Sequence, residues 1–173
     1  MKILGLDSSG IVASVAIVED ENLIAEYTVN YKKTHSQTLL PMLDELVKMT
    51  ELDLDTIDAI AVAAGPGSFT GLRIGSATAK GLGLALKKPL VEIPTVDALA
   101  YNLYDSRALI CPIMDARRSQ VYTGIYRFQE HKLVTVEAQM AVPMAEMIEK
   151  LNARGEEVVF LGDGVPVFGK MIQ

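Results

Sequence analysis

Ile3-Leu4-Gly5-Leu6-Asp7 is a short apolar run that ends in an aspartate, and Cys111-Pro112-Ile113-Met114-Asp115 repeats the pattern 108 residues later. A polar turn and a second apolar segment follow each run. Short apolar runs bounded by turns are typical of buried β-strands. The two runs therefore predict the first strands of two copies of one structural unit.

The segments after each run follow the same order of elements. In the first copy, apolar alternation and helical spacing predict strands at 2–6, 11–18 and 23–29, a helix at 36–49, a strand at 57–64, a helix at 71–87, a strand at 90–93 and a helix capped by Thr95. In the second copy they predict strands at 109–114, 121–128 and 133–136, a helix around 144–151 and a strand at 157–161. Only nine residues follow Gly164, so we expect lobes at 1–105 and 106–173, with the second one truncated.

A βββαβα unit that occurs twice resembles the α/β fold of the actin-like ATPase, Hsp70 and sugar-kinase (ASKHA) superfamily, which is made of two ribonuclease-H-like lobes. The resemblance implies a nucleotide held between the turns that follow the two first strands. A dinucleotide-binding Rossmann fold is the alternative, with Glu92 placed 21 residues after Gly71 to hold a ribose. The glycine loop reads GxGxxxG and contains a proline, and the three leading strands have no place in that fold, so we favour the two-lobed fold.

Composition limits the classes of protein further. The 173 residues are 50% hydrophobic and 22% charged, as in ordinary globular domains, and no run approaches the roughly 18 apolar residues of a membrane span. The N-terminal apolar run is too short for a signal peptide, so we expect a cytoplasmic protein with no membrane contact. The single cysteine, Cys111, excludes an internal disulfide and indicates a small buried side chain.

The charge is acidic and unevenly distributed. Sixteen Lys and Arg oppose 22 Asp and Glu, and the fourteen acidic residues up to Asp105 face only eight basic ones. Six acidic residues between Asp44 and Asp58 face only Lys48. A chain without a basic face is a poor autonomous binder of nucleic acid.

The segment Gly65-Pro66-Gly67-Ser68-Phe69-Thr70-Gly71-Leu72-Arg73-Ile74-Gly75 carries the most information. A glycine-rich loop that leads into a helix offers backbone N–H groups to an anion, but it also forms an ordinary tight turn, and both interpretations stay open. It is not a Walker A loop, because no Lys-Ser/Thr pair follows the last glycine. Small residues then recur every four positions in the helix, and either the chain's own sheet or a second chain could pack on them: Gly71, Gly75, Ala79 and Gly83.

Four segments together resemble the TsaB (YeaZ) family of bacterial threonylcarbamoyladenosine biosynthesis proteins: residues 3–9 (ILGLDSS), 34–41 (THSQTLLP), 65–75 and 114–118 (MDARR). The resemblance implies a non-catalytic paralogue of TsaD, the transferase that modifies an adenosine beside the tRNA anticodon. It also implies a heterodimer with a TsaD-like transferase, joined by a TsaE-like ATPase, with tRNA reached only indirectly. A homodimer of the isolated chain is compatible with it.

Several residues would form an eroded nucleotide site in this family: Asp7, Ser8, Ser9, Gly65, Gly67 and Asp115. Capping of its own turn is the favoured role for Asp7. The resemblance leaves room for ATP or ADP with Mg²⁺ at a junction with a partner, but names no certain cofactor. His35 is followed four positions later by Leu39, so the histidine pair with which TsaD-like enzymes hold a metal is absent, and we predict neither a metal site nor a catalytic residue.

Strand 57–64 ends in Ala63-Ala64-Gly65, without the carboxylate that a two-metal nuclease requires. The remaining alternative is a stand-alone nucleotide-dependent phosphotransferase of the same superfamily. If catalysis is absent, the function lies in surfaces. The resemblance then predicts a partner interface on the two helices of the first lobe, formed by Leu39, Leu40, Met42, Leu43, Leu46, Gly71, Gly75, Ala79 and Gly83.

Overall fold

The computed structural model of the chain describes residues 1–31 and 35–172, so Thr34, the first residue of the THSQTLLP segment, lies outside the described residues. The chain forms two compact units, Met1–Pro94 and Thr95–Gln173. Within the described part of the chain, no helix is both long and apolar enough to cross a membrane.

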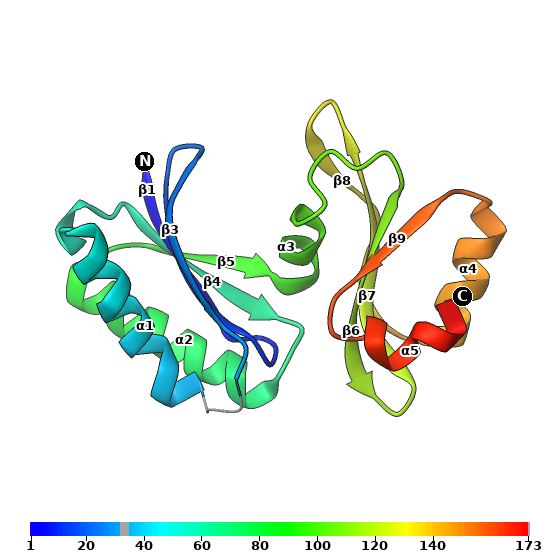
Figure 1. Cartoon of the computed structure of the whole chain (residues 1–173), viewed down its shortest axis with the longest axis horizontal. Coiled ribbons are helices and arrows are strands. Elements are labelled where there is room, and N and C mark those ends of the chain that lie inside the picture. Colours follow the sequence, from blue (N-terminus) through cyan, green and yellow to red (C-terminus); the bar gives the residue numbers. More distant parts are fainter. Residues whose placement is uncertain (32–34, 173) are drawn as a thin grey trace. The chain divides into compact units, whose positions relative to one another are not determined.

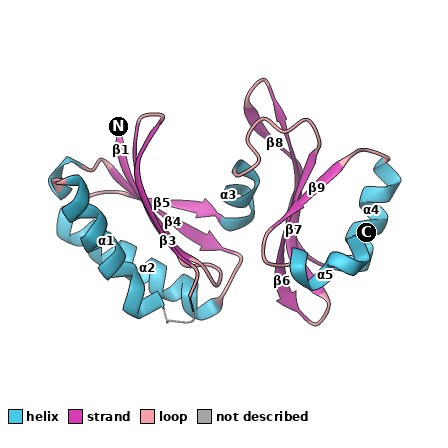
Figure 2. Ribbon diagram, in the orientation of Figure 1, coloured by secondary structure: helices cyan, strands magenta, loops and turns pink. Residues whose placement is uncertain are grey.

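The first unit is a five-stranded sheet with two long helices on one face (Figures 1 and 2). Its elements are β1 (Lys2–Asp7), β2 (Ala13–Glu19), β3 (Asn22–Val29), α1 (His35–Thr50), a 3-10 turn (Leu54–Thr56), β4 (Ala59–Gly65), α2 (Phe69–Leu86) and β5 (Leu90–Pro94). The strand order is β3-β2-β1-β4-β5, with β1 antiparallel to β2 and parallel to β4. This is the order expected of a ribonuclease-H-like lobe.

Alternation along the strands supplies the core of the first unit. Leu4 and Leu6 of β1 and Val15 and Ile17 of β2 are buried and face the same side of the sheet, because every second side chain of a strand shares a face. The buried residues of α1 pack on this surface, and α1 and α2 also contact each other. The two helices therefore share one apolar layer with the sheet.

The second unit is a four-stranded sheet of order β8-β7-β6-β9. Its elements are α3 (Thr95–Tyr101), β6 (Leu109–Arg117), β7 (Gln120–Gln129), β8 (Lys132–Pro143), α4 (Met144–Arg154), β9 (Val158–Leu161) and α5 (Val165–Ile172). The first six residues of β6 are all buried. Cys111 and Ile113 belong to the core that includes residues of α4 and α5, whereas Ile110 and Met114 belong to the core that includes residues of α3. Helices on both faces explain why β6 is apolar without alternation.

The structure confirms the α/β class and the predicted order of helices and strands along the chain as far as β9, and it corrects three details. Val96 and Ala100 of α3 belong to a core with residues of β6 and β7, so the boundary expected after Asp105 lies after Pro94 instead. The third strand of the second unit extends well beyond 133–136, to Pro143. A helix, α5, follows β9, where the sequence interpretation placed no further element.

The expected cap of helix α3 is wrong. The helix begins at Thr95, but the Thr95 hydroxyl is buried and has no hydrogen-bond partner among the described residues.

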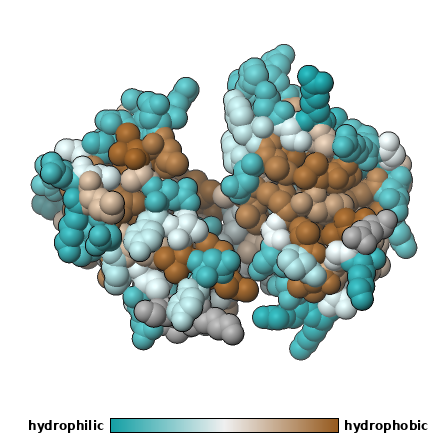
Figure 3. Space-filling model, viewed as in Figure 1, coloured by the Kyte–Doolittle hydropathy of each residue, from teal (hydrophilic) through white to brown (hydrophobic). Residues whose placement is uncertain are grey.

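In the second unit β9 is an edge strand, whereas its counterpart β4 pairs with β5. Figure 3 shows hydrophobic surface over β9 and α5. Five apolar side chains of α4, β9 and α5 line a groove of about 260 Å³: Ile148, Leu151, Val158, Phe160 and Ile172.

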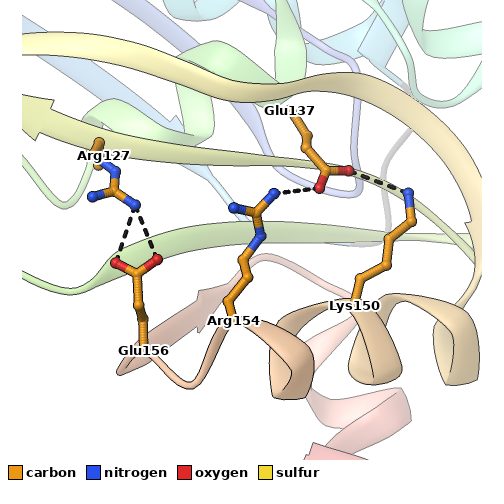
Figure 4. A network of polar contacts seen from close by, with 5 residues as sticks. All are labelled: Arg127, Glu137, Lys150, Arg154 and Glu156. Carbon is orange, nitrogen blue, oxygen red and sulfur yellow. Dashed lines mark hydrogen bonds and ion pairs between the residues drawn. The ribbon is translucent and has the colours of Figure 1, made fainter.

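An ion-pair network fastens α4 to the sheet of the second unit (Figure 4). The Glu137 carboxylate of β8 accepts hydrogen bonds from Arg154, at 2.5 Å, and from Lys150, at 3.2 Å. Nearby, Arg127 donates two 3.1 Å hydrogen bonds to Glu156. The Arg154 hydrogen bond is the main cause that holds the pKa of Glu137 below its usual range.

We expect this network to make stability depend on pH. Because the folded-state pKa of Glu137 is lowered, its contribution is present above the unfolded-state pKa of about 4.3 and is lost as the pH falls through the folded-state value. Glu137→Gln should lower the free energy of unfolding by about 1–2 kcal/mol near neutral pH and should weaken its dependence on pH in the acidic range. Urea unfolding at a series of pH values measures this free energy. Glu149→Gln, at an exposed position of α4, is the control, and equal profiles for both variants would refute the assignment.

Candidate functional site

The glycine loop and the β1–β2 turn form one packed structure in the first unit. The Asp7 carboxylate accepts a hydrogen bond from the Ser9 backbone N–H at 2.8 Å, which confirms that Asp7 caps its own turn. The Ser8 hydroxyl donates to the Gly71 carbonyl at 2.8 Å, and the Ser68 N–H donates to the Ser9 carbonyl at 2.6 Å. The turn therefore holds the first residues of α2 in place.

Close backbone approach explains two glycines of the loop, Gly67 and Gly71. A Cβ on Gly71 would lie 2.0 Å from the Ser8 carbonyl oxygen, and one on Gly67 would lie 2.4 Å from the Ser9 carbonyl oxygen. The backbone of the β1–β2 turn thus fills the space beside Gly67 and Gly71 that a phosphate would need. Ser8 and Ser9 are 2% and 3% exposed, so their side chains do not line an open anion site. These residues do not fit a nucleotide in the first unit alone.

His35 has a structural contact at the start of α1. Its ring nitrogen Nε2 lies 2.8 Å from the Gly10 carbonyl oxygen, and its ring also lies beside Gly71. Leu39, one helical turn further, is in the core. Among the described residues, no group of three or more His, Cys, Asp and Glu side chains is placed to hold a metal ion.

Asp115 occupies the corresponding turn of the second unit. Its carboxylate accepts the Arg117 backbone N–H at 2.9 Å and pairs with the Arg117 guanidinium at 3.4 Å, while its own N–H donates to Asp163 at 3.1 Å. Asp115 therefore caps its turn, as Asp7 does. A nucleotide site that includes both Asp7 and Asp115 stays a prediction.

The structure places most of the predicted interface residues in the interior. Leu39, Met42, Leu43 and Leu46 are at most 5% exposed and pack in the core of the first unit, whereas Leu40 is 52% exposed. The row Gly71, Gly75, Ala79 and Gly83 is buried as well, against Ser8, Val62 and Leu90 of the same unit. The chain's own sheet and turn therefore cover this row, and Leu40 is the predicted interface residue that reaches the surface.

A second row of small residues, which the sequence analysis missed, lies on the opposite face of α2. Ala77, Gly81 and Ala85 are exposed and four residues apart, and Leu84 beside them is 83% exposed. A Cβ on Gly81 would meet nothing within 4 Å. A glycine inside a helix costs roughly 1 kcal/mol relative to alanine, and packing within the unit gives no reason for this one. The four-residue spacing of Ala77, Gly81 and Ala85 is the sequence pattern from which this row could have been predicted.

The same face of α2 borders a groove of about 460 Å³ beside β4 and β5. Its charged lining residues are Arg73 and Lys80 of α2 and Glu92 of β5. The Arg73 guanidinium lies 4.2 Å from the centre of the Phe69 ring, which is 71% exposed. Glu92, the ribose ligand of the Rossmann alternative, thus lines a groove beside α2.

Comparisons with known proteins find similarity to two related groups, a TsaD family model and curated TsaB proteins. The profile described as "TsaD: tRNA N6-adenosine threonylcarbamoyltransferase" matches residues 22–173. The tRNA threonylcarbamoyladenosine biosynthesis protein TsaB of Bacillus subtilis is 36% identical over all of this chain and 76% of its own length, and TsaB of Escherichia coli is 30% identical over 95% of this chain and 72% of its own. The solved structure of YeaZ from Pseudomonas aeruginosa superposes with a TM-score of 0.74 and 31% identity, covering 82% of this chain and 66% of that one.

Proposed function

The chain belongs to the TsaB family of tRNA threonylcarbamoyladenosine biosynthesis proteins, and we propose that it acts there as a non-catalytic subunit that binds a TsaD-like transferase through the exposed faces of α1 and α2. The exposed row Ala77, Gly81 and Ala85 carries the proposal. It offers a second helix a surface on which backbones can approach closely. Leu84 and Leu40 add apolar area to these two neighbouring helices.

Three features support a non-catalytic role. His35 contacts a backbone carbonyl, its helical neighbour Leu39 is a core residue, and Asp7 is used to cap a turn. A TsaE-like ATPase would join the assembly, and tRNA would be bound by the assembly rather than by this acidic chain alone. ATP or ADP with Mg²⁺ at the junction with the partner remains a prediction for the complex.

The test is a steric change on the exposed row. Gly81→Leu should leave the chain folded, since the position is open to solvent, but should weaken the complex with the cognate TsaD-like transferase by at least about thirtyfold. Ala153→Leu is the matched control, at an exposed helical position in the second unit. Calorimetric titration of each variant with the purified transferase measures the affinity.

Equal affinity of Gly81→Leu and the control would remove the exposed row of α2 from the interface. The phosphotransferase alternative has a separate test, titration of the isolated chain with ATP and Mg²⁺. We expect no micromolar binding, because Ser8 and Ser9 are buried and the glycine loop is occupied by the β1–β2 turn. Micromolar binding with turnover would overturn the non-catalytic role.

A further inference from the structure

The outer edge of β3 is a long edge that carries a single charged side chain, Glu26. β3 has eight residues, is the last strand of its sheet and contains neither Lys nor Pro. Three of its large apolar side chains are exposed: Leu23, Ile24 and Tyr27. The opposite edge strand, β5, has five residues and ends in Pro94. Exposed apolar edges are templates for an added strand, and proteins usually shorten, charge or cover them.

The part of β3 that could accept a strand is regular. The pairing of β2 with β3 shifts between Ile17 and Val18, but Ala13–Ile17 pairs in register with residues 25–29. A groove of about 430 Å³ runs along this regular part, between the strand and the C-terminal half of α1. Its walls include Ala25 and Tyr27 of β3 and Leu46 and Met49 of α1, and Met49 is 79% exposed. Among the described residues of the first unit, an added strand would therefore find both an open edge and an apolar wall.

The charge around this edge selects the added strand. Glu45 of α1 lines the groove on the helix side of the sheet. The Glu26 carboxylate lies on the other side, where it accepts a hydrogen bond from Thr28. Side chains of an added strand alternate between the two sides, so both sets would meet a carboxylate. A second copy of this chain would bring the same Glu26 and Glu45 against them, and like charges oppose such pairing.

We propose that the β3 edge and its groove bind an extended segment of a partner protein that carries Lys or Arg together with apolar residues, by adding a strand to the sheet. Main-chain hydrogen bonds to β3 supply affinity, and the carboxylates select the sequence. The site lies on the edge strand and on the part of α1 that carries Glu45 and Met49, and it includes neither Leu40 nor the exposed row of α2, so it does not depend on the proposed function.

The test uses the whole chain and a blocked peptide of four Val-Lys repeats. NMR hydrogen exchange should show new protection of amides within β3, with saturable binding. Two control peptides should bind much more weakly: four Val-Glu repeats, which lack the complementary charge, and the Val-Lys peptide N-methylated at alternate residues, which cannot complete the strand hydrogen bonds. Equal binding of either control, or no protection of β3 by the Val-Lys peptide, overturns the proposal.

Two charge-reversal substitutions test whether peptide binding depends on this groove or only on the overall negative charge of the first unit. Glu45→Lys should weaken binding of the Val-Lys peptide by about fivefold. Asp55→Lys makes the same change of charge at an exposed site outside the groove and should have less effect. Equal effects would mean non-specific attraction and would refute the proposal. Protection of β3 that rises with protein concentration in the absence of peptide would assign the edge to a second copy instead.

Discussion

Replacing Gly71 by alanine is expected to lower the free energy of unfolding of the first unit by about 3 kcal/mol, although alanine is the better helix former. The new Cβ would lie 2.0 Å from the Ser8 carbonyl oxygen. This atom belongs to the backbone of a buried turn, which is itself held by the Asp7 and Ser8 hydrogen bonds, so a side-chain rotation cannot relieve the clash. Separation of α2 from the β1–β2 turn is the expected response.

Gly81→Ala is the matched control, because it makes the same chemical change in the same helix. Nothing lies within 4 Å of the new Cβ there, so the free energy of unfolding should rise by about 0.5–1 kcal/mol because the unfolded chain becomes less flexible. Urea unfolding followed by circular dichroism measures both variants. If both substitutions change the free energy of unfolding in the same direction, the row Gly71, Gly75, Ala79 and Gly83 is not packed against the chain's own turn and sheet.

The glycines of α2 illustrate what the sequence could and could not predict. The four-residue spacing from Gly71 to Gly83 correctly indicated one face of a helix without bulk. It could not distinguish the chain's own sheet from a partner, because both require the same spacing. The shifted row through Gly81 was overlooked, since Gly81 and Gly83 are two residues apart in sequence yet lie on opposite faces of the helix.

Local patterns were more informative about elements than about their assembly. Apolar alternation and helical spacing predicted each strand of the first unit and both of its long helices. The placement of α3 escaped prediction, because it depends on contacts distant in sequence, such as the 2.6 Å hydrogen bond from the Tyr126 hydroxyl to Asp97. The turn cap of Asp7 was predicted from the sequence and is confirmed, whereas the cap formed by Asp115 was not predicted and is seen only in the hydrogen bond from the Arg117 N–H.

The burial of the predicted interface residues of α1 has a physical reason. A helix that packs on a sheet and on a neighbouring helix buries more of its circumference than one that packs on a sheet alone. Leu39, Met42, Leu43 and Leu46 are all buried in this way, although the family resemblance predicted them in a partner interface. An interface test must therefore use positions outside this set.

Leu46→Lys and Leu84→Lys are expected to separate folding from binding. Leu46 is 3% exposed and packs in the core of the first unit, so a lysine there would break the apolar packing and remove its ammonium group from water, and we expect a loss of at least about 4 kcal/mol of unfolding free energy. Leu84 is 83% exposed, so the same substitution should change stability by no more than about 0.5 kcal/mol. Urea unfolding of the isolated chain tests this contrast.

The same two variants then separate the two explanations of a lost complex. Leu84→Lys should weaken binding of the TsaD-like transferase by about 2 kcal/mol, or roughly thirtyfold, while the chain stays folded, because a charge is placed in the apolar surface beside Gly81. Leu46→Lys should lose the complex only because the first unit unfolds, so its circular dichroism should change as well. If Leu84→Lys binds as tightly as the unmodified chain, the exposed face of α2 is not the interface, whatever Leu46→Lys does.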